Sequence, residues 1–101
     1  MPDLLELMEQ CQRDTQEVLG DGAAGRLAYW LDYRNDRERL VKFIQDRIHS
    51  DTWENGARLH RRGKMSLERI VVECGTVVFN SKDIERAQDT LKMARFLDRS
   101  L

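Results

Sequence analysis

The segment 23–50 constrains the fold most, because its apolar residues recur at helical spacing and no proline interrupts it. The apolar residues form two clusters, at 27–31 and 40–48, on the side that an amphipathic helix buries. Residues 34–39 between the clusters are all polar. We therefore predict one long helix with a polar middle. Asp36 offers an alternative, since an aspartate here can cap a new helix and break the segment.

Two shorter segments on either side of the long one also have helical patterns. Residues 4–19 repeat apolar side chains four and three apart, and Gly20 ends the pattern. This repeat forms an apolar seam along one side of the helix. The seam is too short for a free coiled coil, so we expect it to pack on its own domain or on a second copy of the chain. Residues 52–62 form a weaker pattern, in which Gly56 costs a helix about 1 kcal/mol relative to alanine.

The last third of the chain predicts two more helices. Ser66 is a good N-cap and Gly75 a good terminator for a helix over 66–74. The β-branched residues of 70–79 favour a short β-hairpin instead, which remains the competing interpretation. A continuous apolar stripe then predicts a final helix from about residue 81 to residue 97.

The composition agrees with a helical protein. Charged residues make up 35% of the 101 residues, aromatic residues 7%, and the single proline is Pro2. A β-sandwich or barrel needs more turn residues than this. We predict an all-α protein: one domain over 1–101, a compact bundle of about five helices around a long central helix.

Net charge and cysteine content indicate a cytoplasmic protein. The net charge of −1 produces no general attraction to nucleic acid or membrane. Asp3 and Glu6 stand where a signal peptide would carry basic residues, and the apolar runs are far shorter than the about 20 residues that span a bilayer. Cys11 and Cys74 lie at apolar positions, which suits reduced, buried thiols.

A basic stretch at 58–64 is the most distinctive local charge pattern. It contains no acidic residue, and its cations are Arg58, Arg61, Arg62 and Lys64. Such a stretch can bind phosphate groups of a nucleic acid or another anion. Basic residues near a helix C-terminus are also common without any ligand, because they complement the helix dipole. The acidic residues within 3–21 offer a partner surface for these cations, in the same molecule or across a dimer.

Aromatic residues and the first apolar seam are the candidates for a protein interface. Tyrosine and tryptophan are enriched in the energetically dominant residues of interfaces, although they also fill cores. The seam of the first helix could pair two copies of the chain. The predicted interface residues are Leu4, Met8, Tyr29, Trp30, Tyr33 and Trp53.

Motifs for catalysis, cofactors and metal ions are missing from the sequence. The two histidines and two cysteines are not at ligand spacing, and neither a glycine-rich phosphate loop nor a nucleophile elbow occurs. We expect no catalytic residue, cofactor or metal site. The leading hypothesis is a small cytosolic, non-enzymatic adaptor or regulator that acts through protein–protein interaction, including homodimer formation. The alternative is a small nucleic-acid-associated regulator that uses 58–64.

Overall fold

The structure is a computed structural model that describes residues 3–50 and 52–99. Within these residues the chain forms six α-helices and two short 3-10 helices, and no strand. The elements are α1 (Leu4–Leu19), α2 (Asp21–Leu27), η1 (Ala28–Tyr33), α3 (Arg37–Ile48), α4 (Glu54–Arg61), α5 (Leu67–Cys74), η2 (Gly75–Val77) and α6 (Ser81–Arg99).

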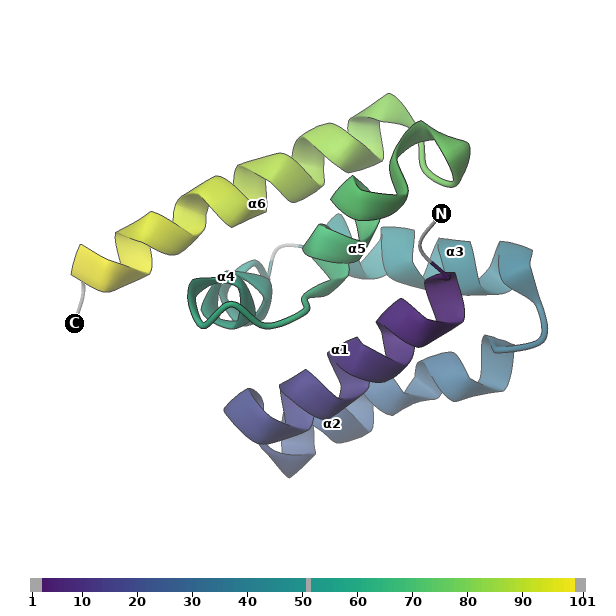
Figure 1. Cartoon of the computed structure of the whole chain (residues 1–101), viewed down its shortest axis with the longest axis horizontal. Helices are drawn as coiled ribbons and strands as arrows, with labels where there is room; N and C mark the ends of the chain where they lie inside the picture. The colour runs from purple at the N-terminus through teal and green to yellow at the C-terminus, as the bar shows by residue number, and fades with distance from the viewer. Residues whose placement is uncertain (1–2, 51, 100–101) are drawn as a thin grey trace.

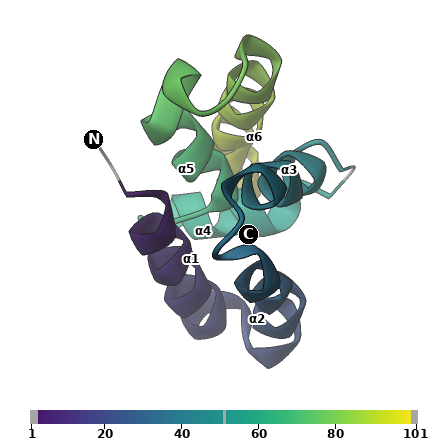
Figure 2. The ribbon, with the colours of Figure 1, turned by 90° about the vertical axis from the view of Figure 1, so that its right-hand side faces the viewer.

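The helices pack as two groups with α3 between them. In both ribbon views α1 and α2 lie side by side at one end of the molecule, while α5 and α6 lie at the other (Figures 1 and 2). Helix α4 packs against α6 and also contacts α1 and α5. The radius of gyration is 12.7 Å, which is normal for a compact chain of this length. The predicted all-helical bundle is confirmed.

The predicted continuous helix over 23–50 is wrong, because the polar middle breaks it. The chain passes from η1 through a turn and reverses direction before α3 (Figure 1, right). Asp36 has an extended backbone, and its Oδ1 accepts a hydrogen bond from the backbone N–H of Arg39 at 3.2 Å. This side chain satisfies a donor that the first turn of a helix leaves unpaired. The alternative interpretation of Asp36 as a cap is therefore the right one.

The hairpin alternative for 70–79 is also wrong, and the predicted helix forms instead. Ser66 caps α5, because its Oγ accepts a hydrogen bond from the backbone N–H of Arg69 at 3.1 Å. Gly75 follows the last residue of α5 with φ of 63°, a value that favours glycine. A cap and a terminator on either side of an eight-residue helix thus override the β-propensity of its valines.

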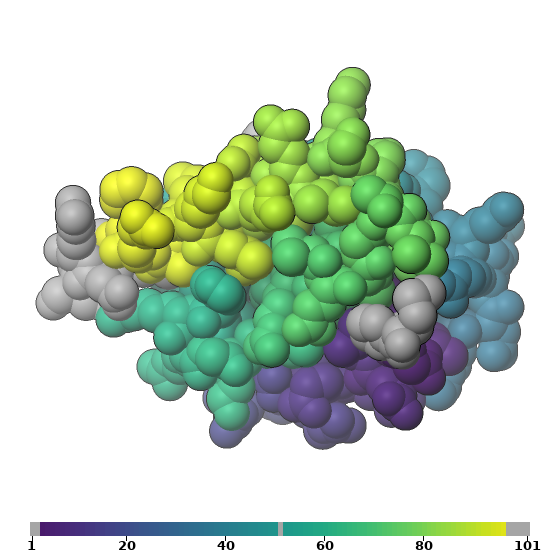
Figure 3. All heavy atoms as spheres, turned by 45° about the horizontal axis from the view of Figure 1, so that its top comes forward, coloured from purple at the N-terminus to yellow at the C-terminus, as the bar shows by residue number. Residues whose placement is uncertain are grey.

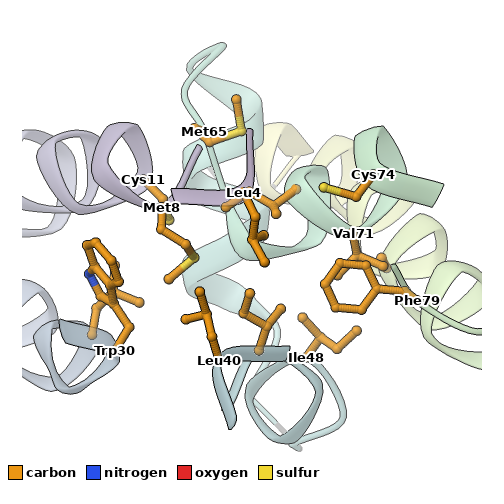
Figure 4. Close-up of a cluster of buried hydrophobic side chains, with 14 residues drawn as sticks. Leu4, Met8, Cys11, Trp30, Leu40, Ile48, Met65, Val71, Cys74 and Phe79 are labelled. Atoms are coloured by element: carbon orange, nitrogen blue, oxygen red, sulfur yellow. The ribbon is translucent and has the colours of Figure 1, made fainter. Parts of the chain in front are cut away.

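The core gathers side chains from five of the six α-helices, all but α4, and from η1 (Figure 4). Trp30 is fully buried, and its indole N–H donates a hydrogen bond to Oε1 of Gln12 at 3.0 Å. The other end of Gln12 donates to the carbonyl oxygen of Ala24 at 2.9 Å, so this one side chain connects α1 to both α2 and η1. The buried apolar cluster consists of Leu4, Met8, Cys11, Leu27, Trp30, Leu40, Ile44, Ile48, Met65, Ile70, Val71, Cys74, Phe79 and Ala87.

Both cysteines are buried free thiols, as predicted. Burial raises the pKa of the Cys11 thiol to about 12, and burial also raises the pKa of Cys74. Neither sulfur is therefore ionised at neutral pH, and reactions that require a thiolate are disfavoured at both.

Candidate interaction surfaces

Three of the predicted interface residues belong to the core of this chain. The exposed fractions of Leu4, Met8 and Trp30 are 3%, 0% and 1%. Leu4 and Met8 point into the cluster that also contains Leu40 and Val71 (Figure 4). A side chain that is buried within the monomer offers no surface to a partner. The seam of α1 therefore packs on its own domain, which is one of the two arrangements that its sequence allowed.

Two other residues of η1, Tyr29 and Leu31, are exposed to solvent. Tyr29 is 63% exposed and Leu31 is 43% exposed, although Trp30 between them is buried. A 3-10 helix turns once every three residues, so neighbouring side chains point in different directions. Burial of Trp30 in the core thus directs the two flanking apolar side chains toward solvent.

Tyr33 forms part of a small cluster with α3. Its ring centroid lies 5.9 Å from that of Phe43, at an interplanar angle of 45°. The guanidinium of Arg47 lies 4.9 Å from the centroid of Phe43 on α3, within the range of a cation–π contact. Both rings are half-buried and pack against the core on one side. We group Tyr33, Phe43 and Arg47 with the two exposed residues of η1, Tyr29 and Leu31, and call this group the aromatic surface.

A shallow depression of about 250 Å³ lies beside the two rings. Arg39, Lys42 and Asp46 complete its wall. Lys42 pairs with Asp46 at 3.4 Å, and both side chains are largely exposed. Exposed pairs of this kind contribute little to stability and separate easily. The depression thus combines an aromatic floor with charged groups that remain available for pairing.

Trp53 does not line this depression. It is half-buried and directly precedes α4, and its backbone N–H donates a hydrogen bond to the carboxylate of Glu54 at 3.1 Å. The structure therefore does not unite the predicted aromatic residues in one site. Sequence reasoning missed Phe43 and Arg47, which their spacing of four residues on α3 places on one face.

The predicted basic stretch spans the second half of α4 and the turn after it. Arg58, Arg61 and Arg62 are exposed. Lys64 is half-buried and pairs with Glu17 of α1 at 3.0 Å. The hydrogen bond to Glu17 raises the pKa of Lys64. An acidic residue of α1 thus partners one cation of the stretch within the same molecule.

Helix α6 adds two cations that the sequence pattern did not connect to this stretch. A groove of about 430 Å³ runs between α4 and α6, lined by His60, Arg61, Lys92 and Arg95 with an apolar floor of two residues. The two helices lie directly against each other in Figure 3, where α4 is teal and α6 is green to yellow. Among the described residues that line the groove, none is acidic. We call this the basic groove.

The described residues contain no group of three or more His, Cys, Asp or Glu side chains that could hold a metal ion. No helix over the described range has both the length and the apolar character needed to cross a membrane.

Comparison of the chain with protein-family models, with curated proteins and with solved structures finds no match.

Proposed function

We propose that this protein is a small, non-enzymatic adaptor or regulator of the cytoplasm that binds another protein through the aromatic surface. The observation that carries this proposal is the 63% exposure of Tyr29 beside a fully buried tryptophan. Tyrosine adds large contact area at a low cost in side-chain entropy, and arginine and tyrosine dominate the binding energy of many interfaces. Both residue types belong to this surface.

The partner that fits this surface is a protein segment with an apolar side chain flanked by acidic ones. The apolar side chain would enter the depression beside Tyr33 and Phe43. Arg39 and Lys42 line the depression and Arg47 lies against the Phe43 ring, so carboxylates nearby are favoured. The proposal does not include a dimer through the seam of α1, because Leu4 and Met8 are buried.

Variants of two exposed residues test this proposal. Tyr29→Ser combined with Leu31→Ser removes apolar area that solvent already contacts, so the fold should persist. Val77→Ser is the matched control, because Val77 is 67% exposed and lies on η2. Tagged wild type, double variant and control are incubated with nuclease-treated extract of the native host, and captured proteins are quantified by mass spectrometry.

The proposal predicts at least one protein that the wild type and Val77→Ser retain equally and the double variant loses about tenfold or more. Light scattering of the purified chain then shows whether that partner is a second copy. If the double variant retains every captured protein at the wild-type level, the aromatic surface is not the binding site.

A second candidate function is supported by the basic groove. Lys92 and Arg95 extend the positive charge of 58–64 onto a second helix, and a surface formed by two helices contacts more phosphates than one loop. On this hypothesis the protein is a nucleic-acid-associated regulator. Fluorescence anisotropy with labelled duplex DNA and single-stranded RNA tests it.

Affinity for nucleic acid should fall steeply with salt, and Lys92→Ala combined with Arg95→Ala should weaken binding and lessen that salt dependence. Arg13→Ala on α1 is the control and should leave both unchanged. Absence of binding at low salt, or equal affinity of the double variant and the wild type, would contradict this second function.

A further inference from the structure

A pocket of about 270 Å³ opens between α1, α2, α4 and α5, and it shares only Arg47 with the two surfaces described above. Its inner wall is formed by buried residues, including Cys11, Thr15 and Glu68. Arg26, which is exposed, and Arg47, which is half-buried, stand at its mouth. These two arginines and Glu68 are the charged residues among the described residues that line it. The volume suits a ligand of about ten non-hydrogen atoms.

Glu68 is an unusual member of this wall, because its side chain is only 6% exposed. The carboxyl group accepts a hydrogen bond from its own backbone N–H. Among the described residues, no hydrogen bond or ion pair from another side chain to this carboxyl group occurs. Burial raises the pKa of Glu68, although the nearby Arg86 opposes the rise. A buried carboxylate with no hydrogen bond or ion pair from another side chain is costly, and a ligand that supplies one recovers part of that cost.

Gly56 of α4 makes room for this carboxylate. A Cβ atom at residue 56 would overlap Oε1 of Glu68. An acidic residue in the first turn of a helix interacts favourably with the helix dipole, and Glu68 does so in α5. An exposed glutamate gives the same benefit without losing its hydration. The dipole therefore does not account for a carboxylate that is buried against a glycine of another helix.

The charges of the cavity are separated, with a carboxylate inside and guanidinium groups at the mouth. Arg47 donates a hydrogen bond to the backbone carbonyl oxygen of Arg26 at 2.9 Å, which anchors the Arg47 side chain beside α2. A simple cation would be repelled at the mouth, and a simple anion would be repelled by Glu68. We propose that this cavity binds a small zwitterion, with its ammonium group against Glu68 and its carboxylate against Arg26 and Arg47.

Three probes of one length test the proposal by NMR titration of the ¹⁵N-labelled protein at pH 7. The probes are 6-aminohexanoate, which carries both charges, and hexylamine and hexanoate, which each carry one. The protein variants are Glu68→Gln, which keeps the side-chain volume, and Arg26→Gln at the exposed mouth. Glu73→Gln on the exposed side of α5 is the control.

We expect saturable shifts at Cys11, Thr15, Gly56 and Glu68 with 6-aminohexanoate, and affinities at least about tenfold lower for either single-charge probe. Glu68→Gln and Arg26→Gln should each lower the affinity for 6-aminohexanoate by about tenfold, whereas Glu73→Gln should not. If Glu68→Gln fails to fold, Arg26→Gln decides the outcome. Absence of saturable shifts at millimolar 6-aminohexanoate, or wild-type affinity in the folded variants, would overturn the proposal.

Discussion

Oδ2 of Asp14 accepts a hydrogen bond from the backbone N–H of Met65 at 2.8 Å, across 51 residues of sequence. Asp14 lies in α1 and is only 6% exposed. Its other carboxylate oxygen accepts a hydrogen bond from Nε2 of Gln10, also at 2.8 Å. The residue that follows the basic stretch is thus attached to α1 by a buried contact, beside the ion pair between Lys64 and the exposed Glu17.

Replacement of this carboxylate should destabilise the fold. In Asp14→Ala the N–H of Met65 stays buried without its acceptor, which costs about 1–3 kcal/mol of unfolding free energy. Urea denaturation followed by circular dichroism measures this. The control Glu17→Gln should leave the unfolding free energy nearly unchanged, because exposed ion pairs contribute little. Equal effects of the two variants would show that the buried contact has no special role.

The second prediction concerns Asp36, the N-cap that divides the segment 23–50. Asp36→Ala should lower the unfolding free energy by about 1 kcal/mol, because the N–H of Arg39 loses its acceptor. Asp36→Asn should retain most of the stability, since asparagine is an equally good cap. Thermal or urea denaturation of both variants measures these changes in unfolding free energy. A wild-type midpoint for Asp36→Ala would mean that the cap does not determine where α3 begins.

Asp83 makes the stability of the fold sensitive to acid. Burial alone would raise the pKa of its carboxyl, but hydrogen bonds from Gln45, His49 and the backbone N–H of Asn80 outweigh this and lower the pKa from its ordinary value of 3.8. The unfolded state therefore binds a proton at higher pH than the folded state does. The stabilisation is complete above pH 3.8 and is lost as the pH falls through the lowered pKa.

Thermal unfolding between pH 6 and pH 2 tests this effect of Asp83. The wild type should lose stability below pH 3.8 more steeply than Asp83→Asn, whose side chain does not ionise. Parallel curves for the two proteins in that range would contradict the assigned hydrogen bonds.

Replacement of Gly56 by alanine should change the unfolding free energy in opposite directions in two backgrounds. In the wild type, Gly56→Ala brings a Cβ into the carboxylate of Glu68 and should destabilise the protein. In the Glu68→Ala background that obstacle is gone, and the same change should stabilise α4 by up to about 1 kcal/mol. A double-mutant cycle by urea denaturation measures the difference. The same sign in both backgrounds would contradict the close packing of residues 56 and 68.

Local signals in the sequence predicted most of the helices. Ser66 and Gly75 bound α5 where the sequence placed them, and α1 spans the predicted range 4–19. These predictions were correct because a cap or terminator acts within a few residues of itself. The break at Asp36 was identified only as the alternative to a continuous helix, because a polar segment forms a helix or a turn with similar local energies. The packing of the apolar clusters on either side, at 27–31 and 40–48, then decides whether the segment is a helix or a turn.

Features that depend on contacts between residues far apart in sequence were harder to predict from the sequence. The sequence indicated Gly56 only as a weak point of a helix, whereas the structure places it against Glu68, which is 12 residues away on another element. The sequence likewise gave no reason to connect Arg61 with Arg95. The apolar pattern around Tyr29 and Trp30 predicted that some of these side chains are buried, but the 3-10 geometry of η1 determines which ones.

The central claim, that the exposed side of η1 binds a protein partner, is tested most directly by site-specific photocrosslinking. A photoreactive phenylalanine derivative replaces Tyr29 in one protein and Val77 in another, and both are irradiated in extract of the native host. The account predicts that position 29 forms a discrete adduct with a partner and that position 77, which is equally exposed, does not. No adduct at position 29, or identical adducts at both positions, would contradict it.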